Sequence, residues 1–114
     1  MIDTEKANIY IGKFMGMKWD EDVKALYKSI IKDGWTQTQY FYPKYHSSWD
    51  DLMPVVAEIE LIAPTRVVID CNECRIIADK RFKVHTMKKI NSVYLCVLQF
   101  IEWYNDKHQG TFKS

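Results

Sequence analysis

The sequence predicts an α+β fold with elements in the order helix, helix, strand, helix, strand, strand, helix (ααβαββα). Two observations carry this prediction. Apolar residues recur at helical spacing over residues 48–61 and 86–107. Short runs rich in β-branched and aromatic residues occur at 35–42, 66–70 and 74–78. We therefore expect a short antiparallel sheet packed against two or more helices.

The length of the chain predicts a single domain over residues 1–114. Hydrophobic residues make up 47% of it, which is enough to bury a core and excludes wholesale disorder. The seven Tyr and four Trp either wall a thin core with their polar ends in water or leave aromatic surface for a partner. The last residues, about 108–114, are expected to be frayed.

Two helices are predicted first. Residues 4–15 form a short one that Gly16 ends. Residues 20–33 form a clearer one, with acidic residues at its front and Gly34 as its stop. The predicted inward stripe of this second helix is Val23, Leu26, Tyr27, Ile30 and Ile31.

An edge strand and a capped helix follow. Residues 35–42 are read as the strand, which Pro43 stops. Ser48 can cap the helix over 48–61 by accepting a hydrogen bond from a backbone N–H of the first turn. Pro54 lies inside that helix and should bend it or make its start irregular.

The last part of the chain predicts a hairpin and the longest helix. The strands 66–70 and 74–78 would be joined by a turn at Asn72-Glu73, and residues 81–84 would extend the second strand. Thr86 then opens the helix, which runs to about Lys107 and is ended by Gly110.

No catalytic, cofactor or metal site is predicted. Cys71 and Cys74 form a lone C-x-x-C pair, whereas a structural zinc needs four ligands, so we read them as two thiols flanking a turn. Cys96 lies among apolar neighbours and is expected in the core. The chain has no G-x-S-x-G elbow, P-loop or G-x-G-x-x-G motif. We expect a protein that is not an enzyme.

The net charge of +1 conceals an asymmetry. Residues 1–60 hold 7 Lys against 10 acidic residues, and residues 61–114 hold 9 basic against 5 acidic ones. The densest basic cluster surrounds Phe82 and His85, and it could meet RNA phosphates, meet an acidic protein, or simply be a solvated surface. This cluster consists of Lys80, Arg81, Lys83, Lys88 and Lys89.

The beginning of the chain, MIDTEKANIYIG, lacks the basic stretch and apolar run of a signal peptide. No apolar run approaches the roughly 18 residues needed to span a bilayer. The sequence therefore predicts a cytoplasmic protein without a membrane partner.

Residues 44–60, KYHSSWDDLMPVVAEIE, resemble a segment that recurs in small uncharacterised proteins of Bacteroidetes phages and prophages, which typically read YHSSWDWLMPVVEKIE. The FMG at 14–16 and the QFIEWYN at 99–105 also match that family. The helix predicted at 20–33 departs from it, because the family usually has variable, more strand-like sequence there. The resemblance implies a phage or mobile-element origin and gives no activity.

Small phage proteins without catalytic residues often bind host machinery. We therefore expect a non-catalytic inhibitor of a bacterial defence system, an anti-CRISPR protein directed at an RNA-targeting CRISPR effector nuclease or its guide-RNA complex. Inhibition would need an aromatic anchor patch, and an acidic triplet could imitate phosphate toward a basic channel. The expected anchors are Trp35, Tyr40, Tyr42 and Tyr45, and the triplet is Asp20, Glu21 and Asp22.

Two alternatives stay open. The first is a small RNA-binding module that uses the basic cluster, for which binding to naked RNA would depend steeply on salt. The second is a structural or housekeeping phage protein that self-associates. The sequence does not set the oligomeric state.

Overall fold

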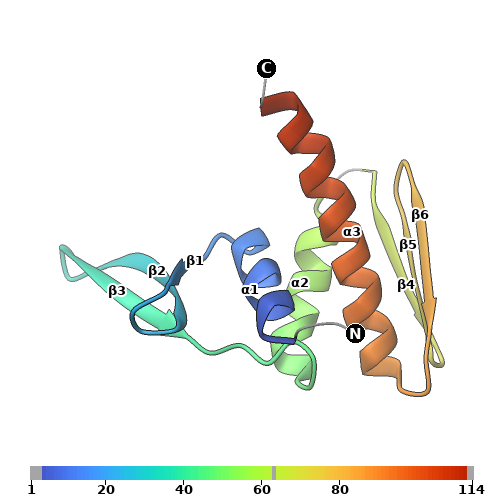
Figure 1. Cartoon of the computed structure of the whole chain (residues 1–114), viewed down its shortest axis with the longest axis horizontal. Helices are drawn as coiled ribbons and strands as arrows, with labels where there is room; N and C mark the ends of the chain where they lie inside the picture. Colours follow the sequence, from blue (N-terminus) through green and yellow to red (C-terminus); the bar gives the residue numbers. More distant parts are fainter. Residues whose placement is uncertain (1–3, 63, 113–114) are drawn as a thin grey trace. The chain divides into compact units, whose positions relative to one another are not determined.

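The computed structural model describes residues 4–62 and 64–112. Within these residues it contains three helices and two three-stranded antiparallel sheets, which confirms the α+β class (Figure 1). The chain divides into two compact units, Met1–Lys44 and Tyr45–Ser114, each with its own sheet. The single domain expected over 1–114 stays a prediction.

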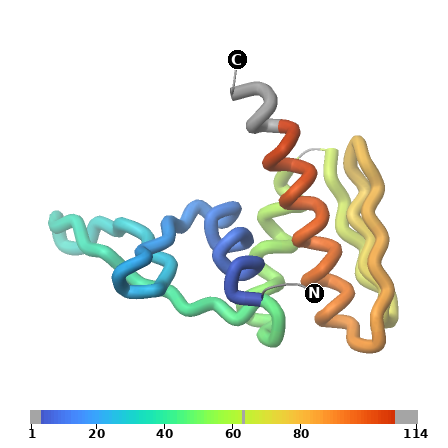
Figure 2. Tube along the Cα trace, in the orientation of Figure 1, coloured from blue at the N-terminus to red at the C-terminus, as the bar shows by residue number. Residues whose placement is uncertain are grey.

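The first unit consists of one helix and a meander of three strands. Its elements are α1 (Thr4–Phe14), β1 (Lys18–Asp20), β2 (Ala25–Lys32) and β3 (Trp35–Phe41), and the strands are ordered β1-β2-β3. Because β1 pairs only with residues 25–27, the outer part of the β2–β3 hairpin extends past it as a two-stranded ribbon (Figure 2).

The helix predicted over residues 20–33 is wrong, because residues 25–32 form strand β2. Asp33 and Gly34 have φ values of 53° and 80°, and the residues on either side of them are paired as Lys32 and Trp35. Two central residues with positive φ make a type I′ turn, whose twist matches that of an antiparallel hairpin. Gly34 therefore closes a hairpin instead of ending a helix.

The core of the first unit lies where α1 meets the meander. Ala7 and Ile11 of α1 and Ala25 and Leu26 of β2 are buried. Gly12 is also buried, and a Cβ atom at this position would lie only 2.4 Å from Cδ1 of Leu26. The glycine therefore allows the Leu26 side chain to lie directly against the helix backbone.

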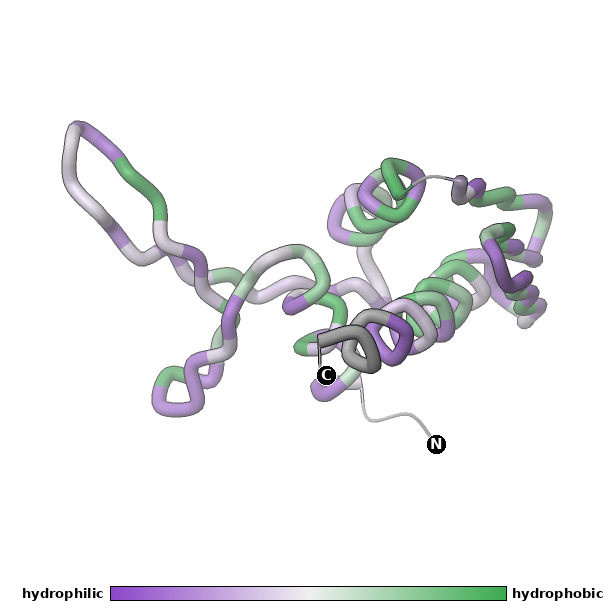
Figure 3. The backbone as a smooth tube through the Cα atoms, turned by 90° about the horizontal axis from the view of Figure 1, so that it is seen from above, coloured by the Kyte–Doolittle hydropathy of each residue, from purple (hydrophilic) through white to green (hydrophobic). Residues whose placement is uncertain are grey.

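The second unit is a sheet with two helices on one face, as Figures 1 and 3 show. The helix α3 contacts β5 and β6, and α2 contacts β4 and α3. The strands are ordered β4-β5-β6 and are all antiparallel. The elements are α2 (Trp49–Glu60), β4 (Arg66–Asp70), β5 (Glu73–Ile77), β6 (Arg81–His85) and α3 (Lys89–Phe112).

Three predictions for the second unit need correction. The β4–β5 turn consists of Cys71 and Asn72, since Asp70 pairs with Glu73. Residues 81–85 form a separate strand because the chain reverses after Ile77. The helix α3 begins at Lys89, three residues after Thr86, and it continues through Gly110 to Phe112. The expected fraying over 108–114 stays a prediction, and residues 113–114 lie outside the described residues.

The two helices of this unit supply most of its core. Ser48 is the N-cap of α2, as predicted, and its Oγ accepts a hydrogen bond from the Asp51 N–H at 3.3 Å. The inward side of α2 is fully buried, and so is the inward side of α3. These side chains are Leu52, Val55, Val56 and Ile59 from α2, and Val93, Tyr94, Cys96, Val97, Phe100 and Ile101 from α3.

A buried hydroxyl fastens the start of α3 to the β4–β5 turn. Ser92 Oγ donates to the carbonyl of Asn72 and accepts from the backbone N–H of Thr86 at 2.9 Å. Ser92 is 0% exposed, so these bonds satisfy a polar group that water does not reach. Thr86 thus binds the first turn of α3 through Ser92, although the helix itself begins at Lys89.

Candidate functional site

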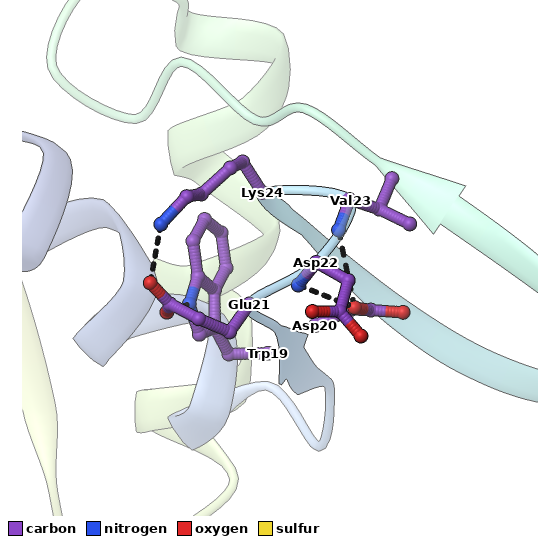
Figure 4. A network of polar contacts seen from close by, with 6 residues as sticks. All are labelled: Trp19, Asp20, Glu21, Asp22, Val23 and Lys24. Atoms are coloured by element: carbon purple, nitrogen blue, oxygen red, sulfur yellow. Dashed lines mark hydrogen bonds and ion pairs between the residues drawn. The ribbon is translucent and has the colours of Figure 1, made fainter.

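The acidic triplet begins at Asp20, the last residue of β1, and continues into the turn of residues 21–24 that leads to β2 (Figure 4). Asp20 Oδ1 accepts from the backbone N–H groups of Asp22 at 2.9 Å and Val23 at 3.2 Å. This is an Asx turn, in which the carboxylate stands in for a backbone acceptor. Lys24 completes the reversal with φ of 62° and donates its N–H to the Asp20 carbonyl at 2.8 Å.

Glu21 also bonds within this turn. Its carboxylate accepts from Trp19 Nε1 at 2.7 Å and forms an ion pair with Lys24 Nζ. The hydrogen bond from Lys24, and then that from Trp19, lowers the pKa of Glu21 below its usual value. Asp20 and Glu21 therefore shape the turn, and contact of the triplet with a basic partner stays a prediction.

The four predicted aromatic anchors separate into two environments. Trp35, Tyr40 and Tyr42 are 74%, 41% and 68% exposed. Tyr45 is only 3% exposed, so its expected place on an open surface is wrong. Burial, followed by the charge of Asp51, raises the pKa of Tyr45 to about 12.

The β2–β3 register decides which exposed side chains share a face of the hairpin. Directly paired residues lie on the same face, and neighbours along a strand lie on opposite faces. Trp35, paired with Lys32, therefore lies on one face, and Tyr40, paired with Tyr27, lies on the other. The rings of Tyr27 and Tyr40 have centroids 6.2 Å apart.

The sequence reasoning missed Ile31, which is 80% exposed next to the hairpin turn. It had been assigned to the buried stripe of a helix that does not form. The signal that identifies its true place is the dipeptide Asp33-Gly34, the most common sequence for a two-residue hairpin turn together with Asn-Gly. Both faces of the hairpin thus carry an exposed large apolar residue beside the turn, Ile31 on one and Trp35 on the other.

The basic cluster lies partly on the outer face of the second sheet. The register pairs Arg66 with Ile77 and Ile77 with Arg81, and it pairs Arg75 with Lys83. Arg75 is next to the inward residue Ile76, and Arg81 and Lys83 flank the inward residue Phe82, so these three cations lie on the face turned away from the helices. Arg66 lies on the same face because it is paired with Ile77. Arg66 and Arg75 were missed, because only the register brings them beside Arg81 and Lys83.

This outer face also contains an acid. Glu73 lies 3.2 Å from Arg75 Nε and 3.6 Å from Lys83 Nζ, although the Arg75 contact lacks hydrogen-bond geometry. Phe82, which was expected to interleave with the cations, is 6% exposed and stacks edge-on with Phe100 and Trp103. It therefore belongs to the core and cannot stack on a base.

A shallow groove of about 460 Å³ runs between β6 and α3. Its lining contains cations from β6 and the turn before it together with two acids of α3, Glu102 and Asp106, so it has mixed charge. Trp103 lines this groove, and Lys107 lies over its ring with Nζ 5.1 Å from the centroid. Lys107 also forms an ion pair with Asp79 at 2.9 Å. A mixed-charge groove of this kind suits no single class of small anion.

Two of the three cysteines are buried in the core of the second unit. Cys74 and Cys96 are both 0% exposed, and the Cys96 thiol donates to the Cys74 carbonyl at 3.4 Å. The neighbouring Cys74 side chain, and then burial, raises the pKa of Cys96, which favours the protonated thiol. Cys71 is exposed in the β4–β5 turn. No group of three or more His, Cys, Asp or Glu side chains that could hold a metal occurs among the described residues.

Comparison with protein-family models, with curated proteins and with solved structures gives no match for this chain. Within the described part of the chain, no helix is both long enough and apolar enough to cross a bilayer.

Proposed function

We propose that this chain is a non-catalytic, phage-type interaction protein that inhibits a bacterial defence complex by binding it, and that the β2–β3 hairpin makes the central contact. The observation that carries the proposal is the exposure of large apolar side chains on this hairpin. Ile31 and Trp35 on the hairpin are 80% and 74% exposed, and Tyr42, directly after β3, is 68% exposed. Aromatic anchors of this kind supply much of the energy of protein interfaces.

The geometry of the hairpin suits an anchor. Its type I′ turn and its seven paired positions fix the backbone before any contact is made. A pre-formed strand pair loses less conformational entropy on binding than a mobile loop does. Lys28 and Lys32 share the face of Trp35, which favours a partner surface with acidic groups around an apolar pocket.

The class of target rests on the resemblance of residues 44–60 to proteins of Bacteroidetes phages. Within that class we propose an anti-CRISPR role against an RNA-targeting CRISPR effector nuclease. The first experiment is a pull-down of the tagged chain from a Bacteroidetes lysate that expresses CRISPR effectors, with and without RNase. A nuclease captured after RNase treatment supports the proposal, and capture of no nuclease contradicts it.

Paired variants then test the role of the hairpin. Ile31→Ser and Trp35→Ala should each reduce affinity for the captured partner by tenfold or more, about 1.4 kcal/mol or greater. Leu61→Ser is the matched control, because Leu61 is 79% exposed, almost as much as Ile31, but lies after α2 in the other unit. Equal affinity of all three variants and wild type would remove the hairpin from the interface.

A second candidate is an RNA-binding module, and the outer face of the second sheet favours it. Arg66, Arg75, Arg81 and Lys83 gather there, with Glu73 as the acid that contacts two of them. Binding of a labelled single-stranded RNA should weaken steeply with salt if these cations contact phosphates. The double reversal Arg81→Glu/Lys83→Glu should then abolish binding.

Lys88 and Lys89 offer a well-controlled test of the same candidate. They lie at the start of α3, where no acidic residue occupies the first turn and where positive charge opposes the helix dipole. Lys88→Glu/Lys89→Glu should therefore stabilise the helix, so lost RNA binding in this variant cannot be attributed to unfolding. Unchanged RNA binding in both double variants excludes the basic cluster.

A further inference from the structure

The outer edge of β3 has the properties of a strand that accepts another strand. β3 is the last strand of its sheet and pairs only with β2, and residues 35–40 are all exposed. Its sequence, WTQTQYF, contains no charged residue and no proline. Edge strands of monomeric proteins usually carry such residues, which discourage pairing with another chain.

The hairpin turn determines which backbone groups line this edge. In a two-residue turn the flanking residues, here Lys32 and Trp35, form a hydrogen-bonded pair. Hydrogen-bonded and non-hydrogen-bonded pairs alternate along an antiparallel ladder. The N–H and C=O groups of Thr36, Thr38 and Tyr40 therefore point away from β2, toward the open edge.

We propose that the partner at this edge is a second copy of the same chain, paired antiparallel about Thr38. In this register Thr38 lies opposite Thr38 of the other copy, and Thr36 lies opposite Tyr40. These are the residues with outward backbone groups, so every hydrogen-bonded pair of the new ladder is complete. The register uses all seven residues of β3, which is the longest overlap that two such strands can have.

The side chains also match in this register. Trp35 lies opposite Phe41 and Gln37 lies opposite Gln39, so each of these two pairs joins side chains of the same kind. No like charges face one another, because the strand has none. Paired residues keep the same face, so the two sheets join into one continuous sheet of six strands.

This inference does not rest on the proposed function. The pairing uses the backbone edge of β3, whereas the anchors proposed for the target project from the faces of the hairpin. A dimer would present two copies of the hairpin to a partner, and a monomer would present one.

A charge-swap experiment tests the pairing. Thr38→Lys places two ammonium groups opposite each other at the twofold axis, and Thr38→Glu places two carboxylates there. In sedimentation equilibrium the wild type should be a concentration-dependent dimer and each variant alone a monomer. An equimolar mixture of the two variants should regain the mass of a dimer. A wild type that is monomeric at every concentration overturns the proposal that β3 pairs with a second copy of the chain.

Two further variants separate the edge from the hairpin itself. Ser29→Lys is the matched control. Ser29 pairs with Thr38 inside the hairpin, so this substitution adds the same charge one strand away from the edge. It should remain dimeric. Thr38→Pro removes an N–H that points away from β2, so the hairpin should persist while the dimer is lost. A dimer that survives both Thr38→Lys and Thr38→Pro contradicts the assigned edge.

The same variants keep this proposal distinct from the proposed function. A monomeric Thr38→Lys that still binds the captured nuclease would retain the inhibitor proposal and confirm the role of the edge. Ile31 belongs to β2 and so lies outside the new ladder. Loss of target binding in Ile31→Ser, with the dimer still present in that variant, would show that the faces and the edge act separately.

Discussion

At the scale of single residues, the Leu26 side chain leaves no room for a Cβ atom at Gly12. A Cβ atom there would lie 2.4 Å from Cδ1 and 2.8 Å from Cδ2 of Leu26, which is 2% exposed and has little room to move. We expect Gly12→Ala to destabilise the first unit by about 1–3 kcal/mol through overpacking. This would outweigh the gain of about 1 kcal/mol that alanine gives inside a helix. Urea unfolding measures the difference.

The cause can be tested by making space. In a Leu26→Ala background the clash disappears, so adding Gly12→Ala should then be neutral or stabilising. If Gly12→Ala costs the same in both backgrounds, contact with Leu26 is not the reason for the glycine.

Ser92 is the other residue whose role is fixed by its partners. Ser92→Ala leaves the carbonyl of Asn72 and the N–H of Thr86 to rely on the 3.3 Å contact between them. We expect a loss of about 1–3 kcal/mol in the free energy of unfolding, because the site is fully buried. Asn91→Ala, on the exposed side of the same turn, is the control and should change little. Equal effects of the two substitutions would contradict a special role for the hydroxyl.

At the scale of elements, α2 contains a proline in its interior. Pro54 is exposed inside the helix, where it cannot donate to the carbonyl of Asp50. Pro54→Ala restores that hydrogen bond and should stabilise the second unit by up to about 3 kcal/mol, measured as a higher midpoint in thermal unfolding. Met53→Ala, an exposed neighbour, should leave the midpoint almost unchanged. A lower midpoint for Pro54→Ala would mean that the proline fixes a bend on which the packing depends.

The elements that sequence reasoning recovered are those with a strong local signal. The cap at Ser48 and the apolar stripe behind it located α2, and the long stripe of α3 was equally clear. The failure at 20–33 has a physical cause. Val23, Leu26, Tyr27, Ile30 and Ile31 fit a helical period by chance, and the turn chemistry of Asp33-Gly34 outweighed that period.

The candidate surfaces were recovered only in part. Of the four aromatic residues that the inhibitor hypothesis named as anchors, Trp35, Tyr40 and Tyr42 are exposed, whereas Tyr45 is buried. Arg66 and Arg75 could not be placed beside Arg81 from sequence, because strand pairing and its register depend on a turn predicted one residue away from its true position.

At the scale of the whole molecule, the charge asymmetry between residues 1–60 and 61–114 does not follow the structural units. Met1–Lys44 holds 7 Lys and 6 acidic residues, giving +1, and Tyr45–Ser114 holds 9 basic and 9 acidic residues, giving 0. Neither unit is therefore a uniformly basic module. Any electrostatic attraction to RNA would have to come from the local arrangement on the outer sheet face.

The second unit should lose stability at alkaline pH because it buries two phenols. Burial, with a smaller effect of the Asp51 charge at Tyr45, raises the pKa of Tyr45 and of Tyr94 from 10 to about 12. Between pH 10 and 12 the unfolded chain has released these two protons while the folded chain still holds them. The stabilisation is therefore complete below pH 10 and falls as pH rises toward 12, by at most about 1.4 kcal/mol per pH unit for each phenol.

Chemical unfolding of the wild type across this range measures the slope. Tyr45→Phe/Tyr94→Phe removes both ionisable groups and should flatten it, even if the double variant is less stable at neutral pH. Tyr42→Phe is the control, since Tyr42 is 68% exposed and should leave the slope unchanged. If the slope between pH 10 and 12 is the same in the double variant and the wild type, burial of these two hydroxyls does not govern the alkaline stability of the chain.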